Sequence, residues 1–201
     1  TAFKEPTAYE QHGTDSWGFQ GNPDLTAEHS QTVEVGYRNT WLDTVVYRTE
    51  ITDLLTYQSN TYVNAPGTSV IQGADLRLTH TVDDVTITNG LSLVRAKDSS
   101  GKQLLRRPEW QNTLAIGYAI DSTQQLSAEW NYYGSHQDIN STTWATETQS
   151  SVSTVDLGYE LYHKQKRFYA TIGNVFDQQY ERPNGYAQQG RNFELGVKLE
   201  F

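Results

Sequence analysis

A serine, a histidine and an aspartate lie within five residues of this 201-residue chain, in Gly134-Ser135-His136-Gln137-Asp138. These residue types form the triad of serine hydrolases, where the imidazole takes the hydroxyl proton and the carboxylate orients the imidazole. In a working triad the three groups converge from separate elements beside an oxyanion site, whereas here they share one loop. We therefore expect solvated loop side chains, no catalytic residues and no enzyme activity.

Metal and cofactor chemistry has equally little support in the sequence. The chain has no cysteine, so it can form neither a thiolate metal site nor a disulfide. Loop carboxylates Asp15, Asp98 and Asp138 could meet around calcium, which prefers oxygen ligands, but solvated surface is the simpler expectation. No glycine-rich phosphate loop is present, and five scattered histidines lack the close spacing of metal ligands: His12, His29, His80, His136 and His163. We expect no metal site and no cofactor.

The remaining chemistry is that of ligand binding by loop side chains. Six of them offer apolar surface or polar tips that could bury and orient a nutrient: Trp17, Phe19, Tyr62, Asn64, Trp144 and Tyr186. Three arginines, Arg106, Arg107 and Arg191, would instead hold an anionic ligand through bidentate hydrogen bonds. Both sets could equally serve loop packing, so the sequence leaves the choice open.

Composition narrows the class of partner. The formal net charge of -9 argues against nucleic acid, whose partners usually carry a basic patch. No run of about 20 apolar residues is present, which excludes a helical membrane span. The chain begins in mid-pattern, without methionine and without a charged apolar leader, so we expect a processed or truncated piece of a longer protein.

Strict alternation of apolar and polar residues is the dominant pattern, and a period of two is that of a strand with two different faces. We predict about nine strands and the stub of a tenth at 1–4, with no helical period. The strands fall near 33–37, 42–57, 74–78, 85–93, 113–120, 126–133, 153–161, 167–175 and 193–201.

The connections alternate in length. Short polar turns fall at 38–41, 82–85, 120–124 and 163–167, and long loops fall at 5–29, 58–69, 95–109, 134–151 and 176–190. This rhythm is typical of an up-and-down antiparallel meander with its long loops at one end. A soluble β-sandwich is the alternative, although its connections would mix hairpins with crossovers.

The two faces of the predicted strands differ in polarity. Charged side chains fall on one face (Glu129, Asp156, Glu160, Glu194, Lys198 and Glu200), and aliphatic and aromatic ones on the other. Thirteen Tyr and five Trp, many near strand ends, match the aromatic girdles of membrane barrels, although both residues also favour strands. We predict an all-β fold, an antiparallel up-and-down transmembrane β-barrel with lipid on one side and water or protein on the other.

Four motifs, in this order, resemble the C-terminal part of TonB-dependent outer-membrane transporters. They are Asn22-Pro23-Asp24-Leu25, Leu104-Leu105-Arg106-Arg107, Asn174-Val175-Phe176-Asp177 with Tyr180, and Gly190-Arg191 before a strand ending at Phe201. Taken by themselves, Asn22-Pro23-Asp24 is a turn, Asn174 and Asp177 cap backbone at a strand end, and Arg191 is placed to pair with carboxylates. We expect loop architecture rather than ligand contact from all of them.

The resemblance covers the whole chain and implies the following organisation. Residues 1–201 would be the C-terminal part of a barrel of about 22 strands, without the family's plug domain and TonB-contacting segment. The protein would be integral to the Gram-negative outer membrane and would take up a scarce nutrient with TonB. Phe201 would be the signal for the barrel assembly machinery.

The resemblance also ranks the ligands. In motif order and loop size, cobalamin transporters resemble this chain most, while ferric-siderophore and haem receptors share several motifs. Cobalamin is therefore the first candidate, and a siderophore or haem the second. A barrel enzyme and a soluble β-sandwich binding module are the alternatives from other classes.

Overall fold

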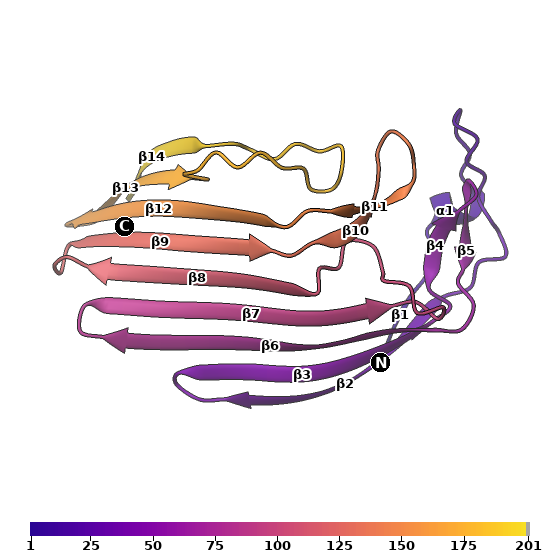
Figure 1. Cartoon of the computed structure of the whole chain (residues 1–201), viewed down its shortest axis with the longest axis horizontal. Helices are drawn as coiled ribbons and strands as arrows, with labels where there is room; N and C mark the ends of the chain where they lie inside the picture. Colours follow the sequence, from indigo (N-terminus) through magenta and orange to yellow (C-terminus); the bar gives the residue numbers. More distant parts are fainter. Residues whose placement is uncertain (200–201) are drawn as a thin grey trace. The chain divides into compact units, whose positions relative to one another are not determined.

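The computed structural model describes residues 1–199, so the predicted signal at Phe201 lies outside the described residues, as does Glu200. Its main feature is a ten-stranded sheet in the order β1-β2-β3-β6-β7-β8-β9-β12-β13-β14 (Figure 1). The strands of this sheet neighbour one another in chain order, without crossovers. The predicted all-β meander is confirmed, and a sandwich topology is not what the chain forms.

Apart from the three-residue β1, the strands of the main sheet are 8–15 residues long, and smaller elements occupy the long connections. The main strands are β1 (Ala2–Lys4), β2 (Glu28–Arg38), β3 (Leu42–Thr52), β6 (Thr68–Val82), β7 (Val85–Lys97), β8 (Trp110–Ala119), β9 (Gln124–Tyr133), β12 (Val152–His163), β13 (Lys166–Gly173) and β14 (Asn192–Leu199). The connections contain helix α1 (Ala8–His12) and two separate hairpins, β4 (Leu55–Gln58) with β5 (Thr61–Asn64) and β10 (His136–Ile139) with β11 (Thr146–Gln149). Within residues 1–199, no helix has the length and apolar character needed to cross a membrane.

Two predictions about elements are wrong. The strand expected over 42–57 ends at Thr52, because Asp53 adopts a left-handed conformation with φ 56°, and the chain resumes as the β4–β5 hairpin. Helix α1 was not predicted, because five residues are too few to show a helical period. A capping box fixes it: Glu10 N donates to Thr7 Oγ1, and Thr7 N donates to the Glu10 carboxylate.

The chain divides into two compact units. The first unit comprises Thr1–Val35, Val46–Gly73 and Arg95–Leu104, and the second comprises Gly36–Val45, Ala74–Val94 and the chain from Leu105. The buried apolar side chains of the first unit are Phe19, Leu25, Ile51, Leu55 and Ala96. The buried residues of the second unit include the polar His136, Asp138 and Asn174 together with Pro108 and Gly134, and its large apolar side chains are mostly on the surface.

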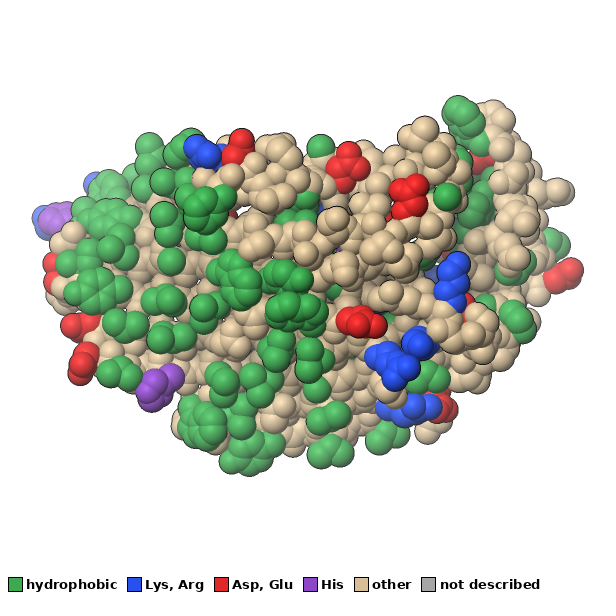
Figure 2. Space-filling model, viewed as in Figure 1, with side chains coloured by type: hydrophobic (Ala, Val, Ile, Leu, Met, Phe, Trp, Pro, Cys, Tyr) green, Lys and Arg blue, Asp and Glu red, His purple; other side chains and the backbone are tan. Residues whose placement is uncertain are grey.

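Strand register in the second unit separates an apolar face from a polar face, because directly paired residues share a face. One row across six strands is Ile87, Ile116, Ala128, Leu157, Ile172 and Phe193. The adjacent row is Thr86, Gly117, Ser127, Gly158, Thr171 and Glu194. Figure 2 shows hydrophobic side chains gathered over strands of this unit. The predicted assignment of residues to faces is therefore confirmed for β7, β8, β9, β12 and β14.

Asn89 is an exception on the apolar face, and its polar groups are satisfied within that face. Its amide nitrogen donates to Asn112 Oδ1 at 3.0 Å and to the Thr113 carbonyl at 3.2 Å. A polar group without such partners would cost free energy in an apolar environment. Asn112 lies on the same face, paired with Leu91, so the two amides satisfy each other where they interrupt the apolar face.

Candidate ligand-binding site

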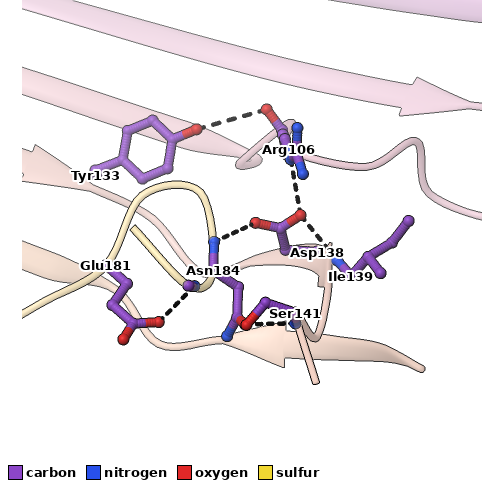
Figure 3. Close-up of polar contacts among 8 residues, drawn as sticks. Arg106, Tyr133, Asp138, Ile139, Ser141, Glu181 and Asn184 are labelled. Carbon is purple, nitrogen blue, oxygen red and sulfur yellow. Dashed lines mark hydrogen bonds and ion pairs between the residues drawn. The ribbon is translucent and has the colours of Figure 1, made fainter. Parts of the chain in front are cut away.

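A buried carboxylate joins three connecting segments of the second unit. The side chain of Asp138 in β10 is 0% exposed, and its Oδ1 accepts hydrogen bonds from Arg106 Nε at 2.7 Å and from Ile139 N at 2.8 Å (Figure 3). Its Oδ2 accepts from Asn184 N at 3.0 Å. Burial alone would raise the pKa of Asp138, but the donors Asn184, Arg106 and Ile139 hold that pKa below its ordinary value.

The turn at 181–187 is fixed by further bonds that Figure 3 draws. Ser141 N donates to Asn184 Oδ1 at 2.9 Å, and Gly185 N donates to Glu181 Oε2 at 2.7 Å. Gly185 has φ +85°, and a Cβ added there would lie 2.7 Å from the Ser141 side chain. Glycine is therefore required for both the turn and its close approach to Ser141.

This turn carries Arg182, whose guanidinium carbon lies 4.5 Å from the centroid of the Tyr133 ring. The Arg182 backbone is also held, since its N–H donates to the Tyr186 carbonyl at 3.0 Å and its carbonyl accepts from Gln188 Nε2 at 2.8 Å. Arg182 and Tyr133 line a cavity of about 460 Å³ together with polar side chains that include Gln111, Asn131, Asp156, Tyr180 and Gln189.

Some polar side chains that line the cavity are hydrogen-bonded within the protein, and others are not. Asp156 Oδ1 accepts from Asn174 N at 2.7 Å, and Asn131 Oδ1 accepts from Thr113 Oγ1 at 2.9 Å. For the part of the chain that the structure describes, no hydrogen bond engages the side chains of Gln111, Tyr180 or Gln189. Such a cavity can hold a polar small molecule through several directed bonds.

The first unit contains a separate aromatic cluster. Phe19 lies at the centre of this cluster and is only 5% exposed. Its ring stacks on that of Tyr9, with centroids 4.6 Å apart, and its centroid lies 6.2 Å from that of Tyr57 and 6.1 Å from that of Tyr62. The preceding loop is capped by Asp15, whose Oδ1 accepts from Phe19 N at 3.0 Å and from Trp17 N at 2.8 Å. The bond from Phe19 N is the main cause that lowers the pKa of Asp15.

Comparison with known proteins decides the family. Residues 1–175 match the model described as TonB dependent receptor-like, beta-barrel. The chain belongs to this family of TonB-dependent receptors. Over its full length it is 29% identical to the vitamin B12 transporter BtuB of Vibrio cholerae serotype O1, and it spans 34% of that relative. The chain thus has about a third of the length of the curated relatives it matches.

Solved structures of similar fold include a ferric enterobactin receptor and a copper transporter. The ferric enterobactin receptor PfeA of Pseudomonas aeruginosa superposes with a TM-score of 0.78 at 18% identity, over 100% of this chain and 37% of that one. The copper transporter OprC gives a TM-score of 0.79 at 17% identity, over 100% of this chain and 36% of that one. At these identities the similarity shows the fold alone.

In the first unit of this TonB-dependent receptor chain, the structure brings together two of the predicted ligand residues. Phe19 and Tyr62 share the aromatic cluster, whereas Trp17 is 88% exposed at a turn. Asn64 is occupied by loop packing, since its amide donates to the Thr26 and Asp53 carbonyls and its Oδ1 accepts from Thr26 N. Contact of these four residues with a ligand stays a prediction.

In the second unit, the predicted ligand residues do not converge on the cavity. Arg106 is paired with Asp138, while Trp144 and Tyr186 are exposed and Arg107 lies on the surface. The Arg191 side chain was expected to pair with carboxylates. In the structure its backbone N–H donates to Asp177 Oδ1 at 2.7 Å. Their contact with a ligand also stays a prediction.

None of the residues that line the cavity was predicted from the sequence as a ligand residue, and Tyr133, Arg182 and Gln189 are examples. Alternation did place Tyr133 on the polar face of β9. No local pattern indicates Arg182, because it lies 49 positions after Tyr133 in the sequence and only the fold of its turn brings the two side chains together. The close approach of these residues is a tertiary property.

The expectation that the Ser135, His136 and Asp138 side chains are solvated is wrong for two of them. His136 is 4% exposed and Asp138 is fully buried, because the hairpin packs against its neighbours. The His136 ring lies edge-on to Tyr133 with centroids 5.0 Å apart, and its Nδ1 is 3.3 Å from the Gly134 carbonyl. The Asp138 carboxylate bonds to Arg106 and backbone amides, so its observed role is to join loops.

Two of the predicted structural motifs, the Asn22 turn and the Asn174 cap, are confirmed. Asp24 N donates to Asn22 Oδ1 at 3.0 Å, which closes the predicted turn. Asn174 caps a strand end, since its Oδ1 accepts from Gln178 N at 2.9 Å and its Nδ2 donates to the Gln178 carbonyl.

Among residues 1–199, no group of three or more His, Asp or Glu side chains could hold a metal ion. The carboxylates of Asp15 and Asp98 accept bonds from their own loops.

Proposed function

We propose that this chain is the C-terminal part of the barrel wall, with its ligand-facing loops, of a receptor that takes up a scarce nutrient. The receptor is integral to the Gram-negative outer membrane and draws energy from TonB through parts outside this chain. The match of the whole chain to a vitamin B12 transporter supports this proposal. Ten strands of a barrel of about 22 would come from residues 1–201.

The apolar face supports a position in lipid. Leu195 is 82% exposed and Phe193 is 72% exposed, an arrangement that costs free energy in water and is favourable against acyl chains. The row that includes Ser127, Thr171 and Glu194 would then face the lumen. Near one end of the apolar face, the rings of Trp110 and Tyr132 lie 4.2 Å apart, as expected for an aromatic girdle at a membrane interface.

Cobalamin is the first candidate ligand, because a relative named as a vitamin B12 transporter aligns with the whole of this chain. A ferric siderophore or haem is the second candidate, because the fold is also that of a ferric enterobactin receptor. The aromatic cluster of the first unit and the polar cavity of the second would each supply ligand contacts. The same proposal includes insertion into the membrane by the barrel assembly machinery, with Phe201 as its recognition signal.

Binding to the complete receptor tests this function. Cyanocobalamin and ferric enterobactin are offered in parallel to the purified receptor in detergent, and uptake is followed in cells with and without TonB. Tight binding of one ligand, with uptake that requires TonB, is the expected result. A receptor that binds neither, or uptake that proceeds unchanged without TonB, would contradict the proposal.

A further inference from the structure

We propose that Arg182 is the specificity residue of the polar cavity and binds an anionic oxygen of the ligand, such as a phosphodiester or a carboxylate. This inference rests on the proposed function, because it names the ligand chemistry of the same site. It also assigns to Asp138 the role of a positioning residue, which acts on the ligand only through Arg182.

The guanidinium of Arg182 is arranged to donate to a ligand. Its guanidinium carbon lies 4.5 Å from the centroid of the Tyr133 ring, and among the described residues no hydrogen bond engages the guanidinium N–H groups. Within residues 1–199, the ion pairs do not include Arg182. A guanidinium has five N–H donors in a fixed plane, and carboxylate and phosphate oxygens match that geometry.

The charges that line the cavity determine where an anion can bind. Arg182 and Asp156 are its only charged lining residues among the described ones. Asp156 lies in β12 and its Oδ1 is engaged by Asn174 N, so an anionic group would bind on the Arg182 side, away from that carboxylate. The amides of Gln111 and Gln189 are available to bind neutral parts of the same ligand.

The protein holds Arg182 in place before a ligand arrives. Its backbone is bonded on both sides, to Tyr186 and Gln188, and its turn is tied to the β10–β11 hairpin through Asp138 and Asn184. Ordering a flexible arginine on binding would cost free energy and weaken affinity. Here the turn that carries Arg182 is already ordered when the protein folds, so binding does not bear that cost. The turn therefore acts as a rigid support for the cationic group.

Two nutrient classes share the required chemistry. Cobalamin carries a phosphodiester in its nucleotide loop, and cobinamide is the same corrin without that loop. Ferric siderophores of the catecholate or carboxylate type carry anionic oxygens around the metal. Comparison of cobalamin with cobinamide therefore isolates the phosphodiester, and ferric enterobactin represents the second class.

The experiment uses the complete receptor, with Arg182→Gln, Arg182→Lys and, as a matched loss of one positive charge, Lys166→Gln at the short turn of β13. Arg182→Gln should weaken cyanocobalamin binding by about tenfold to a hundredfold, the range of a charge-assisted hydrogen bond, and change dicyanocobinamide binding by less than about twofold. Arg182→Lys should recover part of the loss, and Lys166→Gln should bind like the wild type. Asp138→Asn should show the same selectivity for cobalamin in weaker form.

The outcomes separate the inference from the proposed function. If the wild type binds ferric enterobactin instead, Arg182→Gln should weaken that binding about tenfold, with a loss that shrinks at high salt. If the wild type binds a ligand and Arg182→Gln binds it equally well, the inference is wrong while the proposed function stands. Equal losses for cobalamin and cobinamide would show a structural role and also overturn it. A wild type that binds none of these ligands overturns the proposed function, and the inference with it.

Discussion

Asp138 illustrates how a carboxylate in a connecting segment can be buried without a metal or a catalytic partner. Its two oxygens accept three hydrogen bonds, and one donor is a guanidinium that also neutralises its charge. An ionised group is tolerated out of water only when it is paired and hydrogen-bonded in this way. The three segments that provide the donors are thereby held together.

Removal of this carboxylate should loosen the 181–187 turn. Asp138→Ala leaves Arg106 and the Asn184 N–H without their acceptor, at a cost of about 1–3 kcal/mol in the free energy of local opening. Hydrogen exchange of residues 181–187 measures the loss. As a control, Asp121→Ala removes a carboxylate that bonds only within its own short turn, to Thr123 and Gln124, and should leave that exchange unchanged.

The same carboxylate gives the turn a defined pH dependence. Folding lowers the pKa of Asp138, so its stabilisation is complete above the ordinary carboxyl pKa of about 3.9 and is lost as the pH falls through the lower folded value. Exchange protection of the turn, corrected for intrinsic rates, should be constant from about pH 7 to pH 5 and decline below about pH 4. Asp138→Asn should lack this decline, and a decline that begins near neutral pH would contradict the assignment.

Residue roles could be predicted from the sequence where the bonds are local. The Asn22 turn spans two positions and the Asn174 cap spans four. The bonds of Asp138 to Arg106 and Asn184 span 32 and 46 positions, so no short motif records them. For the same reason Arg106 was expected to bind a ligand, whereas the structure pairs it with Asp138.

At the scale of elements, alternation predicted the two faces because a period of two is a local property of each strand. Register then extended the assignment across the sheet, since Leu157 pairs with Ala128 on one side and Ile172 on the other. Strand ends were harder to predict. Apolar residues continue past Thr52 into β4, and only the backbone conformation of Asp53 separates the two strands.

Arginine substitutions at two adjacent positions of β13 compare how its two faces tolerate a charge. Ile172→Arg places a charge in the apolar row and should cost about 2–4 kcal/mol if that row faces the middle of the bilayer. Thr171→Arg places the same charge in the polar row and should cost much less. The measurement is the free energy of unfolding of the complete receptor in lipid vesicles, and equal effects would contradict a lipid-facing apolar row.

The aromatic cluster permits a similar comparison in the first unit. Phe19→Ala removes the ring that Tyr9, Tyr57 and Tyr62 pack around, and should destabilise the local structure by about 3 kcal/mol or more. Trp17→Ala, two positions away, removes an 88% exposed ring and should leave the local structure intact. Limited proteolysis of the 5–29 connection distinguishes the two variants. Equal proteolytic sensitivity would show that Phe19 is not the centre of the cluster.

At the scale of the whole molecule, the order of the main sheet begins at β1 and ends at β14, and these two strands are not neighbours in it. Each therefore has one side without a strand partner among the described residues. In water an unpaired edge can be hydrated, but in lipid each unpaired amide or carbonyl costs several kcal/mol. A barrel of the family's size removes both edges by closing the sheet through additional strands.

The isolated 201-residue chain should therefore fail to form a stable monomer in lipid or detergent, whereas the complete receptor should be monodisperse. Without further strands, the edges of β1 and β14 should pair with other copies, so light scattering should report large assemblies whose size grows with protein concentration. Refolding the chain together with the rest of the receptor should restore a defined particle if the missing partners are barrel strands. An isolated chain that stays monomeric in detergent, with the amides of β1 and β14 protected from hydrogen exchange, would show that the sheet can satisfy its own edges and would contradict the proposed place of the chain in a larger barrel.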